Sequence, residues 1–358
     1  MLDWLFRSDF DGVTAAAIWS ILIVLATTIT IFVYTLGLRW VMVVSTHQRT
    51  QLVARWRSVF AAATLRKDDA MTISLPPFGR KQRTILLEEW NRARTAVEGE
   101  SAQNLIILGE RLGLPQIARS MLERRKLKTR ILAIQTLGNL HDIDSRPSIQ
   151  DLVTDENTAL SITAAVALVQ ICPDRAVAML IPLIEKRPDW PRNRVSIFLH
   201  MAGSERISEP MYRAIRSADN SGKTCLLQFA HQVEASVLDA LVEDLIRESN
   251  DPGVLNAALK LVSGHAGVPL IAALIRHKTW FVRVQAAKVL GRVGQQEHLS
   301  LLESMLHDEE WWVRYRAAQA IASLPFLGPN KLRQLQHRQS DPFAADMLQQ
   351  AYAEVGLA

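Results

Sequence analysis

One stretch occurs twice near the C-terminal end of the sequence: WFVRVQAAKVL at residues 280–290 and WWVRYRAAQAI at residues 311–321. The second copy follows the first at a constant shift, so that Trp280 corresponds to Trp311 and Leu290 to Ile321. Self-similarity at a fixed period of roughly 20–50 residues is typical of repeat proteins, whose single units are too small to bury their apolar faces alone. Stacked units bury those faces against one another. The stretch therefore predicts a stack of short repeats rather than one globular domain.

The same register extends towards the N-terminus as pairs of small or apolar residues four positions apart. Successive pairs keep the shift of the doubled stretch, except that the step from the pair at Ala257 to the pair at Ala286 is two positions shorter. Each pair lies in an apolar segment with helical periodicity, and no long stretch alternates between apolar and polar residues, so we expect helices and no sheet. The pairs are Ala102 and Ile106, Ala133 and Leu137, Ala164 and Leu168, Val195 and Leu199, Leu226 and Ala230, Ala257 and Leu261, Ala286 and Leu290, and Ala317 and Ile321.

The Val-Arg-x-x-Ala-Ala-x-x-Leu-Gly run at residues 282–291 resembles the HEAT repeat, in the short bacterial form related to phycobilisome-lyase-type repeats. The copy at residues 313–321 is similar, whereas Val195 and Leu226 stand where the first Ala of the Ala-Ala pair is expected. The resemblance implies an all-α, right-handed α-solenoid of HEAT-like helical hairpins. It also implies that the Val-Arg helices line a concave binding face, and that the protein is a scaffold or adaptor.

The Asp and Arg residues of this motif have two alternative roles. By the resemblance, Asp251 and Asp308 precede the Val helices and are expected to cap them, because a side-chain oxygen there accepts an orphan backbone N–H. Arg283 and Arg314 are expected to pair with carboxylates of neighbouring turns. The alternative role for all four is a ligand site.

A long apolar segment lies near the N-terminus. Residues 12–38 contain no charged side chain. A helix of that length spans roughly 40 Å, which exceeds the roughly 30 Å of a bilayer core. A secretory signal has a basic start and a shorter apolar run, and a buried core helix is the other alternative. The acidic residues before the segment and its length favour a transmembrane helix.

The positive charge follows this segment. Residues 39–135 carry 18 Lys and Arg against 8 Asp and Glu, although the net charge of the whole chain is only +5. Basic residues stay on the cytoplasmic side of a membrane. We therefore expect a single-pass protein of a bacterial inner membrane, with its N-terminus outside and its C-terminal solenoid in the cytoplasm. The expected division is a tail at 1–11, a transmembrane helix at 12–38, juxtamembrane helices and a linker at 39–99, and the solenoid at 100–358.

Composition agrees with a helical protein in a reducing compartment. Hydrophobic residues make up 49% of the 358 residues, charged residues 22% and aromatic residues 6%. The two cysteines, Cys172 and Cys225, are far apart and do not form a disulfide framework or a metal-binding spacing.

Two basic groups are candidates for contact with anionic lipid, which attracts basic residues beside a membrane. The first lies on a basic, amphipathic helix predicted at 39–66, and its alternative role is packing on the next domain. The second lies in the repeat unit nearest the predicted span, and its alternatives are a solvated turn or contact with nucleic acid, which we regard as an unlikely partner. The residues are Arg39, Arg55 and Arg57 in the first group and Arg124, Arg125 and Lys126 in the second.

Aromatic residues recur at the turns before the Val-Arg helices. Trp190, Phe281 and Trp312 are equivalent in the repeat register, and Trp280 is equivalent to Trp311. Aromatic rings at such turns either pack between units or bind a partner, since they bury a large area at a small entropic cost. Adjacent residues of one turn rarely both point inwards. The expected partner-binding residues are Trp280, Trp311, Trp312, Arg283 and Arg314.

No catalytic motif is found. Residues 217–224, Ser-Ala-Asp-Asn-Ser-Gly-Lys-Thr, imitate a phosphate-binding loop but lack its first glycine and are predicted to follow a helix, with Asn220, Ser221 and Gly222 as a loop between two helices. None of the nine histidines stands in HExxH spacing. We expect no catalytic residue, no metal, no cofactor and no small-molecule substrate.

The expected function is that of a membrane-anchored cytoplasmic scaffold that binds a partner protein through its repeat surface. The alternative is a HEAT-like lyase or isomerase that uses the concave groove. An enzyme would have a deep pocket with convergent polar groups, whereas a scaffold would have a broad, open groove.

Overall fold

The computed structural model describes four segments of the chain, residues 12–65, 75–264, 268–293 and 295–354. The described residues form helices and no strands. They divide into two compact units, Met1–Leu140 and His141–Ala358, which are treated separately below. The predicted N-terminal tail and residues 66–74 of the predicted linker lie outside the described segments.

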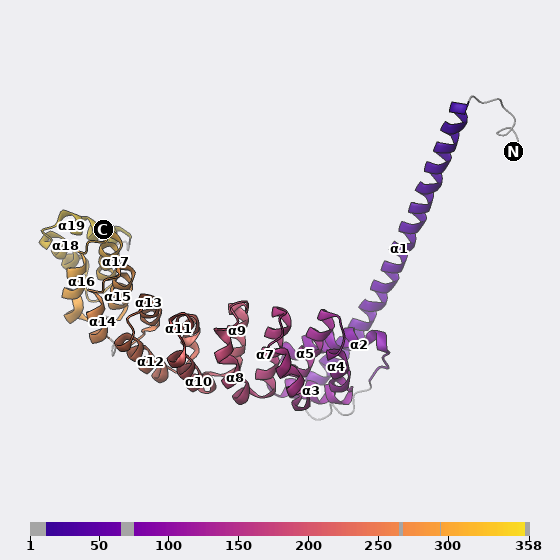
Figure 1. Ribbon diagram of the computed structural model, residues 1–358, viewed down its shortest axis with the longest axis horizontal. Helices are drawn as coiled ribbons and strands as arrows, with labels where there is room; N and C mark the ends of the chain where they lie inside the picture. The colour runs from indigo at the N-terminus through magenta and orange to yellow at the C-terminus, as the bar shows by residue number, and fades with distance from the viewer. Residues whose placement is uncertain (1–11, 66–74, 265–267, 294, 355–358) are drawn as a thin grey trace. The chain divides into compact units, whose positions relative to one another are not determined.

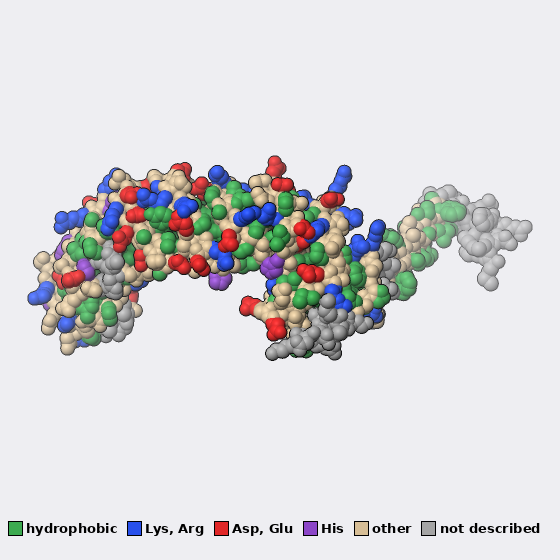
Figure 2. All heavy atoms as spheres, turned by 90° about the horizontal axis from the view of Figure 1, so that it is seen from below, with side chains coloured by type: hydrophobic (Ala, Val, Ile, Leu, Met, Phe, Trp, Pro, Cys, Tyr) green, Lys and Arg blue, Asp and Glu red, His purple; other side chains and the backbone are tan. Residues whose placement is uncertain are grey.

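The first unit begins with one unbroken helix, α1, Gly12–Leu65 (Figure 1). Its segment Ala16–Trp40 is long and apolar enough to cross a membrane, and none of its most apolar stretch is buried. Apolar side chains follow the exposed part of the helix (Figure 2). Further along, Trp56, Phe60 and Ala63 are almost completely buried. The same helix therefore has one apolar part that is not buried and one part that packs into the unit.

The packed part of α1 lies against two of the helices that follow. A 3-10 turn, Arg80–Gln82, leads into α2 (Arg83–Thr95), which is followed by α3 (Gly99–Arg111), α4 (Leu114–Leu122) and α5 (Leu127–Asn139). Helix α2 contacts α1, α3 and α5, and α3 contacts α1. Trp90 of α2 is fully buried, and its Nε1 donates to the Leu105 carbonyl over 2.9 Å. Asn91 of α2 donates to Thr136 of α5 over 2.8 Å, so polar bonds as well as apolar packing join these two helices.

The second unit is a stack of helical hairpins. After a 3-10 turn, Ile143–Ser145, its helices are α6 (Arg146–Leu152), α7 (Thr158–Ile171), α8 (Pro173–Ile184), α9 (Arg192–Ala202), α10 (Ser204–Ser217), α11 (Asn220–Leu227), α12 (Ala235–Glu248), α13 (Pro252–Leu261), α14 (Val268–Leu274), α15 (Trp280–Val293), α16 (Leu299–Met305), α17 (Trp311–Ala322), α18 (Pro329–Arg338) and α19 (Pro342–Glu354). Each odd-numbered helix from α7 packs on the helix before it, and most pack on the next odd-numbered helix (Figure 1).

Small residues allow the odd-numbered helices to approach closely. Ala286 and Ala287 of α15 and Ala317 and Ala318 of α17 are completely buried. A Cβ added at Gly291 of α15 would lie only 2.8 Å from the backbone of α17. The predicted all-α solenoid of helical hairpins, preceded by one apolar helix, is confirmed.

The register is less regular than predicted in the middle of the second unit. Helix α11 ends at Leu227, and Ala230 lies in a separate 3-10 turn, Ala230–Gln232, so Leu226 and Ala230 do not share one helix. The prediction that residues 220–222 form a loop is also wrong. They are the first turn of α11, because Asp219 caps that helix by accepting the Gly222 N–H over 2.7 Å.

Candidate partner-binding surface

Hydrogen bonds to neighbouring residues fix the side chain of Arg283 on α15. Its Nε and Nη2 donate to the two carboxylate oxygens of Asp308 over 2.7 Å each, and its Nη1 donates to the His277 carbonyl over 2.9 Å. The side chains of Arg283 and Asp308 are only 7% and 11% exposed. The hydrogen bonds to Asp308 raise the pKa of Arg283 above its ordinary value. Of the two roles expected for this residue, pairing with a turn carboxylate is the one that its contacts satisfy, and little of its surface is left for a partner.

Of the two aspartates that are predicted to cap helices, only one does so. Asp251 accepts the Val254 N–H over 2.9 Å and caps α13, as predicted. Asp308 does not cap α17, because the capping position of that helix is Glu310. Asp308 instead accepts the Glu310 N–H over 2.9 Å, while both of its oxygens bind Arg283.

Arg314 occupies the same repeat position as Arg283 but has a different environment. Its Nη1 donates to the carbonyls of Asp308 and Glu309 over 2.7 and 3.3 Å. Among the described residues it pairs with no carboxylate, so that prediction is wrong for Arg314. Arg283 binds Asp308, and the residue at the same spacing after Arg314 is the uncharged Gln339. The buried Nε of Arg314 has no acceptor in the described part of the chain.

The aromatic turn residues divide into packed and exposed members. Trp190 is 4% exposed, and its Nε1 donates to the Ser161 hydroxyl over 3.0 Å, so it packs between units. Trp280 is 41% exposed, Trp311 40% and Trp312 50%. Phe281 is half-buried and contacts the edge of Trp280 at a ring-centroid distance of 5.9 Å. Equivalent sequence positions such as Trp190 and Trp312 therefore differ in their exposure.

Trp311, Trp312 and Tyr315 form one aromatic cluster at the start of α17, in which both Trp rings are exposed and Tyr315 is half-buried. The two Trp rings meet edge to face at 4.7 Å, and Trp311 stacks on Tyr315 at 5.1 Å. The Tyr315 hydroxyl donates to the carboxylate of Glu354 on α19 over 2.8 Å, which fixes the ring. An exposed, rigid group of large rings is typical of a protein-binding hot spot.

A cationic row adjoins this cluster. It consists of Lys260 on α13, Lys288 on α15 and Arg316 on α17, which are evenly spaced in the sequence. Partial burial lowers the pKa of Lys288, and the nearby charges of Arg316 and Lys260 lower it further. The Arg316 guanidinium lies 5.5 Å from the centroid of the Tyr315 ring. The row and the cluster therefore form one continuous surface of the second unit.

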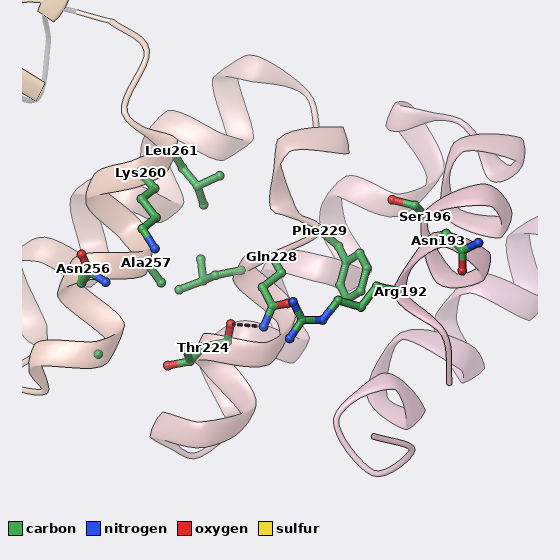
Figure 3. Close-up of a pocket in the computed structure, with 12 residues that line it drawn as sticks. Arg192, Asn193, Ser196, Thr224, Gln228, Phe229, Asn256, Ala257, Lys260 and Leu261 are labelled. Atoms are coloured by element: carbon green, nitrogen blue, oxygen red, sulfur yellow. Dashed lines mark hydrogen bonds between the residues drawn. The ribbon is translucent and has the colours of Figure 1, made fainter. Parts of the chain in front are cut away.

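Two open grooves lie along odd-numbered helices of the second unit. One, of about 720 Å³, lies along α9, α11 and α13, with Leu227, Phe229 and Leu261 among its apolar lining. Figure 3 shows Arg192 and Lys260 pointing into it from opposite sides. The other, of about 580 Å³, lies between α15 and α17 and is lined by Lys288 and Arg316. Both grooves are lined by apolar and cationic side chains.

The predicted lipid-facing residues lie in the first unit. Arg39 and Arg55 on α1 are exposed. Arg57 pairs with the buried Glu89 over 2.9 Å, so it also joins α1 to α2. Arg124, Arg125 and Lys126 are exposed in the turn between α4 and α5. They line a cavity together with Arg80 and Arg83, which the sequence pattern did not reveal.

The described residues include no group of three or more His, Cys, Asp and Glu side chains placed to hold a metal ion. Cys172 and Cys225 are half-buried free thiols, and burial raises the pKa of each. A thiol with a raised pKa is a poor nucleophile because less of it is ionised.

Comparison with known proteins supports the repeat assignment. Residues 116–198 and 267–354 match the family model of HEAT repeats, which confirms the HEAT part of the resemblance for these two segments. The part between them, 199–266, contains the short helix α11. The relation to phycobilisome-lyase-type repeats stays a prediction. No curated protein matches the chain.

Several solved structures are similar in fold at low identity. The karyopherin Kap121p has 13% identity and a TM-score of 0.42, covering 82% of this chain and 43% of its own. Kap121p bound to RanGTP has 12% identity and a TM-score of 0.41, covering 83% and 43%. YibA of E. coli has 13% identity and a TM-score of 0.34, covering 80% of this chain and 100% of its own. This chain thus spans less than half of the karyopherin chains.

Proposed function

We propose that the protein is a membrane-anchored scaffold that holds a partner protein on the cytoplasmic face of a bacterial inner membrane. The observation that carries this proposal is the continuity of α1. One helix has an exposed apolar segment, Ala16–Trp40, and continues without a break into Trp56 and Phe60, which are buried in the first unit, where α1 packs on α2 and α3. A membrane span that continues into a packed helix in this way fixes the protein to the bilayer.

The length and the flanks of the apolar segment support an anchor rather than a signal sequence. The segment has 25 residues, whereas the apolar part of a secretory signal has about 7–15. Arg39 lies at its C-terminal end and Arg49, Arg55 and Arg57 follow it, and such residues favour the cytoplasmic side.

The partner surface in this proposal consists of the aromatic cluster and the cationic row. Exposed Trp rings favour binding because they bury a large apolar area with few rotatable bonds. The cationic row favours a partner segment that carries carboxylates, since a neighbouring negative charge relieves the repulsion among Lys260, Lys288 and Arg316. The partner is therefore a protein with an acidic segment that contains an apolar anchor residue.

The test is affinity capture of the full chain from detergent-solubilised membranes. We expect a stoichiometric protein partner to be retained by the wild type and lost with Trp311→Ala/Trp312→Ala. Phe343→Ala is the matched control, because Phe343 is an exposed ring of α19 outside the cluster. Recovery of the chain alone, or equal retention by the Trp variant, would reject the proposed surface.

The orientation can be tested by cysteine labelling. The native thiols are unsuitable because both are half-buried, so Cys172→Ala and Cys225→Ala provide the background. Glu309→Cys then introduces a thiol at a side chain that is 85% exposed. A membrane-impermeant maleimide should label it only after the cells are permeabilised. Labelling of intact spheroplasts would reverse the proposed topology.

A further inference from the structure

The first unit contains a cavity of about 580 Å³ in which basic side chains converge. The cavity lies where the 3-10 turn before α2, the end of α4 and the start of α5 meet. It is lined by Arg80, Arg83, Thr84, Ser120, Met121, Glu123, Arg124, Arg125, Lys126 and Thr129. Five of these are cationic and one is acidic, so the lining has a large excess of positive charge. We call Arg80, Arg83, Arg124, Arg125 and Lys126 the basic pocket.

The described residues do not neutralise the charges of the basic pocket. Within the described residues, none of the five cations forms an ion pair or donates a side-chain hydrogen bond. The Arg83 Nε is buried and has no acceptor among the described residues. A buried donor without a partner costs about 1–3 kcal/mol, and more when it is charged. An anion in the cavity would remove this cost and the mutual repulsion of the five cations.

The backbone adds to the positive potential. Helix α5 has 13 residues and begins directly after Lys126, with no side-chain cap and no acidic residue in its first turn. Its N-terminal N–H groups and partial positive charge therefore also favour an anion. The hydroxyls of Thr84 and Thr129 line the same cavity and can donate further hydrogen bonds.

We propose that the basic pocket binds a phosphate monoester. Such a group has nearly two negative charges at neutral pH and three strong acceptor oxygens, which match several guanidinium groups better than one carboxylate does. The phosphate belongs either to a lipid headgroup or to a soluble molecule. Helix α2 is tied to α1 by the 2.9 Å pair of Arg49 with Glu88, and Arg49 follows the end of the apolar segment at Trp40 by about 14 Å along the helix. The pocket thus lies in the unit that carries the proposed span.

The test measures binding to the full chain in a neutral detergent by native mass spectrometry and titration calorimetry. The probes are dioctanoyl phosphatidic acid, dioctanoyl phosphatidylcholine and glycerol 3-phosphate. We expect phosphatidic acid to bind at least tenfold more tightly than phosphatidylcholine, whose phosphate is a diester. Arg83→Gln/Arg125→Gln should weaken this binding at least tenfold.

The matched control is Arg213→Gln/Arg247→Gln, which removes the same charge from two exposed ion pairs of the second unit. It should bind like the wild type. Equal affinity for the two lipids, or an equal loss in both double variants, would overturn the proposal. Circular dichroism of all variants shows whether a loss reflects misfolding. If the basic-pocket variant is unfolded, Lys126→Gln, which changes only an exposed residue, replaces it and should weaken binding several-fold.

The soluble probe distinguishes the two sources of phosphate. Binding of glycerol 3-phosphate that depends on Arg83 and Arg125 indicates a soluble ligand, whereas variant-sensitive binding of phosphatidic acid alone indicates a headgroup. Both outcomes support the pocket. The proposal is independent of the partner surface, which lies on other helices. Loss of partner capture with intact phosphate binding would reject only the proposed function.

Discussion

Arg283 and Asp308 are joined by two hydrogen bonds of 2.7 Å, so the helix α15 of one hairpin is bound to the turn before α17 of the next hairpin. Contacts between neighbouring hairpins recur along the second unit at about one repeat length. Thr158 donates to Asp189 over 2.6 Å, and Tyr212 donates to Asp244 over 2.8 Å. The stability of a repeat stack is roughly the sum of its units and their interfaces, so each polar bridge strengthens one local interface.

Asp308→Ala should destabilise the α15–α17 interface by about 3 kcal/mol, because it leaves the buried Arg283 guanidinium without its carboxylate. Hydrogen exchange should accelerate in α15 and α17 and remain unchanged in α7 and α9. Glu309→Ala is the control, since its side chain is 85% exposed and its contact with Arg283 is 3.4 Å. An exposed ion pair contributes at most about 1 kcal/mol. Equal effects of the two substitutions would contradict the structural role of Asp308.

Asp189 should stabilise the fold in a pH-dependent way. Hydrogen bonds from Arg187 and Thr158 hold the pKa of Asp189 far below its ordinary value. A carboxyl group with a lowered pKa contributes its full stabilisation above the unfolded-state pKa of about 3.9 and loses it as the pH falls towards the folded-state pKa. Asp189→Asn should therefore lower the melting temperature by a constant amount between pH 8 and pH 5.

Below about pH 4, the difference in melting temperature between wild type and Asp189→Asn should shrink, because the unfolded wild type then takes up a proton at Asp189 that the folded state excludes. Thermal melting followed by circular dichroism at each pH measures this. A difference that already disappears near pH 6 would show that another group causes it.

Trp190→Ala should mainly lower the folding stability and Trp312→Ala should mainly reduce partner binding, although the two residues are equivalent in the repeat register. Removal of the buried Trp190 should cost about 3–5 kcal/mol, as large core truncations do. Trp312 is half-exposed and makes mainly ring contacts, which contribute about 0.5–1.5 kcal/mol each. Its loss should therefore lower the stability measured by chemical denaturation less than the loss of Trp190 does, and it should reduce partner capture. A large loss of stability with Trp312→Ala would favour a packing role.

The sequence was informative where a residue's environment repeats with the register. The doubled stretch predicted α15 and α17, and the spacing of the small residues predicted that these helices pack closely. The register did not predict that Trp190 is buried and Trp312 exposed, because burial depends on the neighbouring hairpin. Likewise, Arg283 has a carboxylate because the next turn supplies Asp308, whereas Arg314 has Gln339 at the corresponding position.

The basic pocket was only partly predictable. Arg124, Arg125 and Lys126 are adjacent in the sequence and form a visible cluster, but Arg80 and Arg83 lie much earlier in the chain. Only the packing of α2 against α5 brings them to the same cavity. The cationic row was not predictable from the register either, because Lys260, Lys288 and Arg316 stand at different positions of the repeat.

Gly291→Ala should destabilise the second unit, although alanine is the better helix former by about 1 kcal/mol. The added Cβ would lie 2.6 Å from the side chain and 2.8 Å from the backbone of Ala320. Relief of a clash with the backbone requires α15 and α17 to move apart, and such overpacking costs about 1–3 kcal/mol. Adding Ala320→Gly removes the closer of the two clashes but leaves the one with the backbone, so it should restore the stability only in part. Denaturation of the two variants measures this. Complete recovery in the double variant would show that the Ala320 side chain alone, and not the distance between the helix backbones, makes Gly291 necessary.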